Sequence, residues 1–403
     1  MLEDDVTPCL VGVATASGLP LFCRPPRPQL PFSLVGALHG VRLFGAAAGA
    51  ELREAATPTA SLAWAQYGNS LTLVALSPSP GPAGPALQRI LQSALGTLVL
   101  ILGQEELLPI RNVERLKRDL RGCFPLLDSL LRPRGGGGEG WGMGGPCWPL
   151  PPGTPRQALQ ERLQRFAAAA QTELGCLLCA GGVAWLGTAH WGALPDDDSA
   201  HLRALLATPP PPGGGAGVGV AARDVAVFLP NSSPKVPLRL LWLRLLPGVG
   251  AGLLCGPRPS LHHVIGQLVP QFWGPALEQL RGWARPRPPP LPPEVLGYLL
   301  IHRGRSQSGI VKGAGPAGAL PPQLRPEALR ELRTLLEPQI CPKTGGQGPP
   351  QMRPKLCYLA FPTHTGCCLL RPGLTLLLLL PPGTPREPLN PTALNALNAL
   401  GYG

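Results

Sequence analysis

The chain has 403 residues, of which 44 % are hydrophobic and 14 % are charged, and its formal net charge is +12. This composition excludes a disordered chain, because disordered chains are rich in charge and poor in Leu, Ile and Val. At roughly 100 to 200 residues per domain, the length predicts two to four folded domains. The 52 glycines and 54 prolines indicate low-complexity segments between or within them.

The positive charge favours an anionic partner, such as an acidic protein or a phospholipid surface. An alternative is a codon bias, since only five of the 35 basic residues are lysines and Gly, Pro and Ala are also abundant. With 5 % aromatic residues and no zinc-finger or RNA-recognition pattern, the chain is not expected to bind nucleic acid.

The first ten residues are acidic and contain Pro8, so they do not resemble a secretory signal. The longest apolar runs fall far short of the roughly 20 residues that span a bilayer. Eleven scattered cysteines suit reduced, mostly buried thiols. We therefore expect a cytoplasmic protein.

Two biased segments divide the chain, RPRGGGGEGWGMGGP at 132–146 and ARPRPPPLPP at 284–293. A third, at 208–217, is interpreted as an expanded loop. The predicted organisation is a first domain over 1–131, a Gly/Pro-rich linker over 132–154, a second domain over 155–284, a Pro-rich linker over 285–293 and a third domain over 294–403.

Hydrophobic periodicity predicts similar elements in each third. In the first third we expect strands over 9–16 and 21–24, a helix over 30–44, strands over 61–65 and 71–76, and a helix over 86–96. In the second we expect a helix over 155–171, strands over 174–180 and 183–188, a helix over 199–207, strands over 238–246 and 251–255, and a helix over 260–269. In the last we expect strands over 295–303 and 309–312, a helix over 326–337, strands over 356–361, 367–370 and 374–380, and a helix over 389–400.

The recurring order is strand, strand, helix, two or three strands, helix, which indicates three related domains. The largely apolar runs LCYLAF at 356–361 and LTLLLLL at 374–380 are typical of strands that are buried on both faces. We therefore expect an α/β (α+β) fold in which each domain is a five-stranded mixed sheet with one helix on one face and a helix pair on the other.

No phosphate-binding loop or GxSxG nucleophile motif is found in the sequence. Cys176 and Cys179 have CxxC spacing, but a structural zinc site needs four ligands and no second pair follows. The acidic run from Asp196 to Asp198 is interpreted as the charged start of a helix. The sequence thus predicts a non-enzymatic protein without a cofactor or metal.

The segment 110–131 predicts an amphipathic helix with a kink or break near Gly122 and Pro125. Five cations occupy its remaining faces and form a candidate surface for an anionic partner: Arg111, Arg115, Lys117, Arg118 and Arg121. An ordinary solvated helix face is the alternative. In the second linker, Arg287, Pro290 and Pro293 match the RxxPxxP pattern of SH3 ligands, although a semi-rigid spacer explains them too.

Several strings resemble the Fuzzy family of planar cell polarity effectors: PLFCR at 20–24, LPFS at 30–33, IRNVERLKRDL at 110–120, VPLRLLWLRLLPG at 236–248 and LLCGPRPSL at 253–261. The resemblance is close in the first third, good over 220–285 and architectural in the last third. It implies three longin domains, a fold in which a five-stranded sheet lies between one helix and a helix pair.

The resemblance also implies partners: Inturned, a longin and PDZ protein, a WD-repeat effector subunit and a Rab-like small GTPase. It implies action in ciliogenesis and ciliary trafficking at the basal body and cytoskeleton, with nucleotide exchange as a property of the heterodimer. Two alternatives stay open: a constitutive adaptor without exchange activity, and a module that contacts anionic phospholipid through the 111–121 surface.

Overall fold

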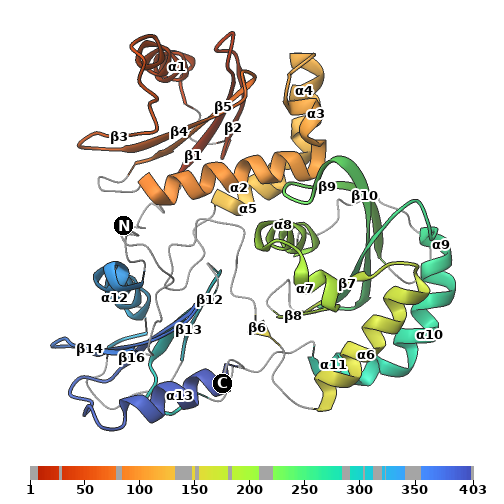
Figure 1. The fold of residues 1–403 in the computed structure, drawn as a ribbon, viewed down its shortest axis with the longest axis vertical. Coiled ribbons are helices and arrows are strands. Elements are labelled where there is room, and N and C mark those ends of the chain that lie inside the picture. The colour runs from red at the N-terminus through yellow and green to blue at the C-terminus, as the bar shows by residue number, and fades with distance from the viewer. Residues whose placement is uncertain are drawn as a thin grey trace.

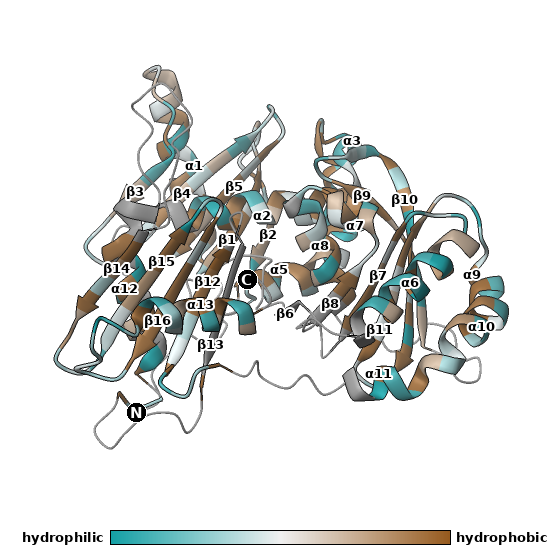
Figure 2. Cartoon of the chain, turned by 60° about the horizontal axis from the view of Figure 1, so that its bottom comes forward, coloured by the Kyte–Doolittle hydropathy of each residue, from teal (hydrophilic) through white to brown (hydrophobic). Residues whose placement is uncertain are grey.

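The computed structural model of the chain contains three β-sheets, each built from a separate third of the sequence (Figure 1). The strands of all three sheets are mainly hydrophobic, as the brown ribbons of Figure 2 show. The structure describes residues 8–26, 30–78, 84–131, 148–149, 154–179, 184–207, 221–283, 291–302, 305–311, 320–322, 324–340 and 355–400.

The first domain is a five-stranded sheet with helices on both faces. Its elements are β1 (Cys9–Ala14), β2 (Pro20–Arg24), α1 (Phe32–Ala47), β3 (Glu54–Ala56), β4 (Ser61–Tyr67), β5 (Leu71–Ser77), α2 (Gly84–Leu102), α3 (Gln104–Leu107), α4 (Val113–Asp119) and α5 (Phe124–Leu131). The strand order is β2-β1-β5-β4-β3. Helix α1 covers one face of the sheet. Helix α2 covers the other face, and α5 packs beside α2.

The second domain repeats this order with an added edge strand and an additional N-terminal helix. Its elements are β6 (Trp148–Pro149), α6 (Thr154–Ala169), β7 (Leu174–Cys179), β8 (Ala184–Gly187), α7 (Ala189–Ala193), α8 (Asp196–Ala207), β9 (Ala222–Leu229), β10 (Ser233–Leu246), β11 (Val249–Cys255), α9 (Leu261–His263), α10 (Val269–Trp273) and α11 (Leu277–Trp283). The strand order is β6-β8-β7-β11-β10-β9. Helix α8 covers one face, and α6, α10 and α11 cover the other.

The third domain has the order β13-β12-β16-β15-β14. Its elements are β12 (Gly297–His302), β13 (Arg305–Ile310), α12 (Arg325–Ile340), β14 (Lys355–Ala360), β15 (Thr365–Arg371), β16 (Leu374–Leu380) and α13 (Leu389–Ala399). Along β16, Leu376, Leu378 and Leu380 pack with α13, while Leu377 and Leu379 pack with α12. The prediction of a strand buried on both faces is therefore confirmed for 374–380. It is wrong for 356–361, because β14 is an edge strand and its Leu356 is 39 % exposed.

The mixed sheets that we expected are wrong in the first and third domains, where every strand pair among the described residues is antiparallel. Short turns join most neighbouring strands, and the connection through α1 or α12 leads to the opposite edge of the sheet, so no parallel neighbours arise. In the second domain, β6 pairs in parallel with β8; it lies inside the 132–154 segment that we predicted as a linker.

The helix pair is present in the first two domains. In the third domain, the described residues place only α13 on the face opposite α12, so the pair predicted there is wrong for this part of the chain. Leu389, Ala393, Ala396 and Leu397 of α13 are buried against that face, and this one helix covers the leucines of β16.

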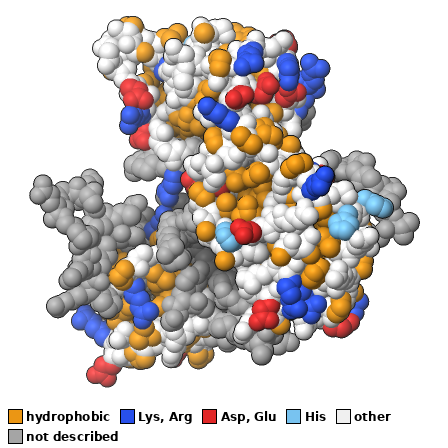
Figure 3. Space-filling view, turned by 45° about the vertical axis from the view of Figure 1, so that its right-hand side comes forward, with side chains coloured by type: hydrophobic (Ala, Val, Ile, Leu, Met, Phe, Trp, Pro, Cys, Tyr) orange, Lys and Arg blue, Asp and Glu red, His pale blue; other side chains and the backbone are white. Residues whose placement is uncertain are grey.

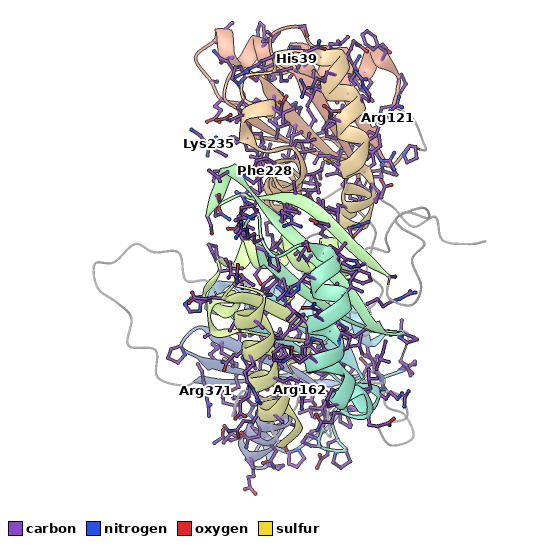
Figure 4. The ribbon with its side chains drawn as sticks, turned by 90° about the vertical axis from the view of Figure 1, so that its right-hand side faces the viewer. His39, Arg121, Arg162, Phe228, Lys235 and Arg371 are labelled. Atoms are coloured by element: carbon purple, nitrogen blue, oxygen red, sulfur yellow. The ribbon has the colours of Figure 1, made fainter. Side chains whose placement is uncertain are left out.

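The first two domains share one hydrophobic core. One side of helix α2 packs against the sheet of the first domain, and another side of the helix contacts α8 and β9 of the second domain. Leu91 and Leu98 of α2 belong to the same buried cluster as Leu202 and Val227 of the second domain. Figure 4 shows Phe228 where the hairpin of β9 and β10 meets the first domain.

Candidate partner-binding site

Helix α1 ends in a regular backbone motif that fixes its length. Gly49 has a positive φ of 75°, a conformation that favours glycine. The N–H of Ala50 donates to the carbonyl of Gly45 at 2.9 Å, and the N–H of Gly49 donates to that of Ala46 at 3.0 Å. This pair of bonds is a Schellman motif, so α1 is a well-terminated helix.

The outward side of α1 is apolar along its length except at Ser33. Its exposed residues are Phe32, Ser33, Leu34, Gly36, Ala37, Gly40, Val41, Leu43, Phe44, Ala46 and Ala47. Phe44 is 79 % exposed, Phe32 69 % and Val41 55 %. A surface helix of a monomer normally presents charged side chains to water, so this face, which we call the α1 surface, has the composition of an interface.

Two polar residues of α1, His39 and Arg42, point inward instead. Arg42 is buried, and its guanidinium donates a hydrogen bond to the side-chain oxygen of Gln66 on β4. His39 is also buried, and burial, assisted by the charge of Arg42, lowers its pKa, which favours the neutral ring. Because His39 and Arg42 face the sheet, Ser33 is the one polar side chain left among the exposed residues of α1.

Small residues give the α1 surface its shape. Gly36 and Gly40 lie one helical turn apart, and a Cβ added at either would meet no atom within 4 Å. Phe32 and Phe44 stand near the two ends of the helix. The α1 surface is thus a shallow strip between two aromatic side chains, and aromatic side chains are enriched where proteins bind one another.

The predicted cationic surface lies on a different part of the first domain. Residues 110–131 fold as α4, a 3₁₀ turn over Leu120–Cys123 and α5, so the break predicted near Gly122 and Pro125 is confirmed. Leu116, Leu120, Leu127 and Leu131 are buried, as the apolar stripe predicted.

Acidic neighbours pair with two of the five cations. Arg115 lies 3.5 Å from Glu106 and 3.6 Å from Asp119, and Lys117 lies 3.1 Å from Glu114. Basic and acidic side chains are interleaved at the upper end of the molecule, where the first domain lies (Figure 3). The three remaining cations are exposed and form no ion pair with the described residues: Arg111, Arg118 and Arg121.

The structure describes only the last part of the SH3-type motif. Arg287 and Pro290 lie outside the described residues, and Pro293 lies in a turn before β12. In the described parts of the chain, no three His, Cys, Asp or Glu side chains are placed to hold a metal ion. No helix in those parts is long and apolar enough to cross a membrane.

One of the strings that resemble the Fuzzy family, PLFCR at 20–24, contacts helix α5. Arg24, at the end of β2, forms a bidentate ion pair with Asp128 of α5, and its guanidinium carbon lies 4.6 Å from the ring centre of Phe124. Residues 10–130, which include all three side chains, match the family described as "First Longin domain of FUZ, MON1 and HPS1".

The similarity extends over nearly the whole chain. It is 37 % identical to the protein fuzzy homolog of Mus musculus, over 97 % of this chain and 96 % of that protein. The chain belongs to the Fuzzy family. Its identity to the Homo sapiens homolog is 38 % over the same shares, and to the Xenopus tropicalis homolog 33 % over 86 % of this chain and 83 % of that protein. Membership in the Fuzzy family thus includes the last third, where the sequence strings gave only an architectural resemblance.

The α1 surface was not identified from the sequence of this Fuzzy-family chain, although the helix itself was predicted. One signal was present: FSLVGALHGVRLFGAA contains a single charged residue, Arg42, in 16 positions. A helix with so little charge is expected to be covered on all sides. Its exposure is what makes it a candidate binding surface.

Proposed function

We propose that this Fuzzy-family chain is a non-enzymatic subunit that pairs through the α1 surface with an Inturned-type longin and PDZ protein. Together with a WD-repeat subunit, the pair recruits or activates a Rab-like small GTPase for ciliogenesis and ciliary trafficking. The proposed place of action is the cytoplasm, at the cytoskeleton and the cilium basal body.

The exposed apolar face of α1 is the observation that supports this proposal. Phe32, Val41, Leu43 and Phe44 are each between 46 % and 79 % exposed. Burial of apolar surface contributes roughly 25 cal/mol per Å², and interfaces that stay assembled are more hydrophobic than transient ones. A permanent partner subunit of matching apolar character is therefore the best occupant.

Exchange activity would need no catalytic side chain in this chain. A protein accelerates nucleotide release when it binds one conformation of the GTPase more tightly than another. Such selective binding requires that the surfaces that contact the GTPase keep a fixed position relative to one another. The hydrophobic core shared by the first two domains holds these domains together rigidly. The proposal therefore assigns exchange to the assembled heterodimer.

The test is co-expression with Inturned, followed by size-exclusion chromatography with light scattering. The unmodified chain should elute as a stoichiometric complex, whereas Phe44→Asp and Val41→Asp should abolish it. Val236→Asp is the matched control, because Val236 is 64 % exposed on β10 of the second domain; it should leave the complex intact. A complex that survives both α1 variants would contradict the proposal.

A nucleotide-release assay on the purified complex separates the two remaining roles. Release of a fluorescent nucleotide from the GTPase should accelerate when the heterodimer is added. A complex that binds the GTPase without changing the release rate would identify a constitutive adaptor instead.

A further inference from the structure

Two cysteines of the first domain lie next to each other on the sheet. Cys9 of β1 and Cys23 of β2 come from adjacent antiparallel strands, and their sulfur atoms are 3.4 Å apart. The register pairs Cys23 with Val11, so Cys9 is its diagonal neighbour. A disulfide has an S–S length of about 2.0 Å, so the two sulfurs must come closer for a bond to form. Both cysteines belong to the side of the sheet that α1 covers.

The two thiols differ in access to solvent. Cys9 is 8 % exposed, whereas Cys23 is only half-buried. A small reagent therefore reaches Cys23 first, while Cys9 lies behind it within contact distance. This is the arrangement of an attacking and a resolving thiol.

The surroundings favour a thiolate at Cys23. A hydrogen bond from Cys9, assisted by the backbone of Leu30 and the charge of Arg24, lowers the pKa of Cys23 to about 6, although burial opposes the shift. The same hydrogen bond, together with burial, raises the pKa of Cys9. The thiolate is the reactive form of cysteine, so the pair has one nucleophile and one protonated reserve.

Other thiols of the chain are placed differently. Burial raises the pKa of Cys123 to about 12 and that of Cys367 to about 11. Cys357 and Cys368 are direct cross-strand neighbours on β14 and β15, but Cys368 is fully buried and its pKa is raised by burial. The latter pair therefore serves as an internal comparison, in which the half-buried Cys357 lies directly opposite the fully buried Cys368.

We propose that Cys9 and Cys23 form a thiol modification site that hydrogen peroxide or a similar hydroperoxide converts to a disulfide. In the first step the Cys23 thiolate attacks one peroxide oxygen; an S–O bond forms, the O–O bond breaks, and the departing hydroxide takes up a proton to become water. Sulfur is oxidised to sulfenic acid and the peroxide is reduced. In the second step the Cys9 sulfur attacks the Cys23 sulfur, the S–O bond breaks, and the hydroxyl leaves as water with the Cys9 proton.

The test uses the full chain, oxidised with hydrogen peroxide and then alkylated under unfolding conditions before peptide mapping. The expected result is a linked peptide pair containing Cys9 and Cys23 with the loss of two hydrogens, while Cys357 and Cys368 are still alkylated. In Cys9→Ser, a dimedone adduct should accumulate at Cys23; in Cys23→Ser, Cys9 should stay free.

Two results would overturn the proposal. One is that Cys9 and Cys23 remain as fully alkylated as Cys357 and Cys368 after oxidation of the unmodified chain. The other is that the same link forms at the same rate in urea, since the folded geometry would then contribute nothing. The unmodified chain alone decides both, so the test does not depend on whether the serine variants fold.

Discussion

The side-chain Nε2 of His201, on α8 of the second domain, lies 3.0 Å from the backbone carbonyl oxygen of Ser93, on α2 of the first. The other ring nitrogen lies 2.6 Å from the carbonyl oxygen of Asp197. Gly96, one turn after Ser93, leaves room for this approach, because a Cβ there would be 2.4 Å from Nε2 of His201. A buried polar contact thus joins two domains inside their shared apolar core.

We predict that Gly96→Ala destabilises the protein by about 1 to 3 kcal/mol, since overpacking forces neighbours to move. Alanine normally stabilises a helix by about 1 kcal/mol relative to glycine. A loss of stability in Gly96→Ala would therefore indicate a steric clash and not a change in helix propensity. Thermal unfolding measures it. Gly40→Ala on α1, where the new Cβ meets nothing within 4 Å, is the control and should be neutral or stabilising.

The double variant provides a sharper check. In a His201→Ala background, Gly96→Ala should lose its cost, because the clashing ring is gone. A penalty of the same size in both backgrounds would show that His201 is not the neighbour that limits this position.

Local patterns predicted most strands and helices of this chain. The consecutive leucines of β16 predicted a strand that is covered on both faces. Gly122 and Pro125 predicted the break before α5. By contrast, β3 (Glu54–Ala56) was missed, since three residues of Glu and Ala carry no strand preference and only pairing with β4 orders them.

Features that depend on tertiary packing could not be predicted from the sequence. In α1 nearly every position is apolar, so periodicity did not show which side faces water, and the inward turn of His39 and Arg42 was hidden. The contact between Gly96 and His201 joins residues about a hundred positions apart, and nothing in either local sequence predicts the other. The candidate site was therefore the least predictable part of the molecule.

The α1 surface should also govern self-association of the isolated chain. Val41→Glu combined with Phe44→Glu should leave the unfolding temperature unchanged, because both side chains are mainly exposed. Light scattering at high protein concentration should show less association than for the unmodified chain, since an apolar patch is replaced by charge. A fall of several degrees in unfolding temperature would instead indicate that these side chains pack within the monomer.

The ion pair between Arg24 and Asp128 should hold α5 against β2. Asp128→Asn keeps the size of the side chain but removes its charge, and should lower the free energy of unfolding by about 1 to 2 kcal/mol, as expected for a partly buried bidentate pair. Urea unfolding measures the loss. Glu51→Gln, which removes the highly exposed pair with Arg53, should leave stability unchanged; an equal loss in both would contradict a special role for Arg24.

We predict that any contact of the chain with an anionic membrane would depend on the three cations that form no ion pair with the described residues. Replacing Arg111, Arg118 and Arg121 by Ala should weaken sedimentation with phosphatidylserine vesicles by about two orders of magnitude at low salt, at roughly 1 kcal/mol per charge near the surface. Arg115→Ala with Lys117→Ala should weaken it less, because acidic neighbours already offset these two charges. Binding that ignores both sets, or that does not fall with added salt, would eliminate the phospholipid role.

The reactivity of Cys23 should depend on pH in a way that distinguishes it from the buried thiols. With a pKa of about 6, its thiolate fraction rises between pH 5 and pH 7 and then levels off. The rate of iodoacetamide alkylation at Cys23, followed by mass spectrometry of the folded chain, should show the same midpoint and plateau. At Cys123, which is fully buried and whose pKa burial raises to about 12, the folded chain should show no alkylation at any of these pH values. Removing the hydrogen bond from Cys9 with Cys9→Ala should move the Cys23 midpoint upward; an unchanged midpoint would mean that Arg24 and Leu30, not Cys9, activate the thiol.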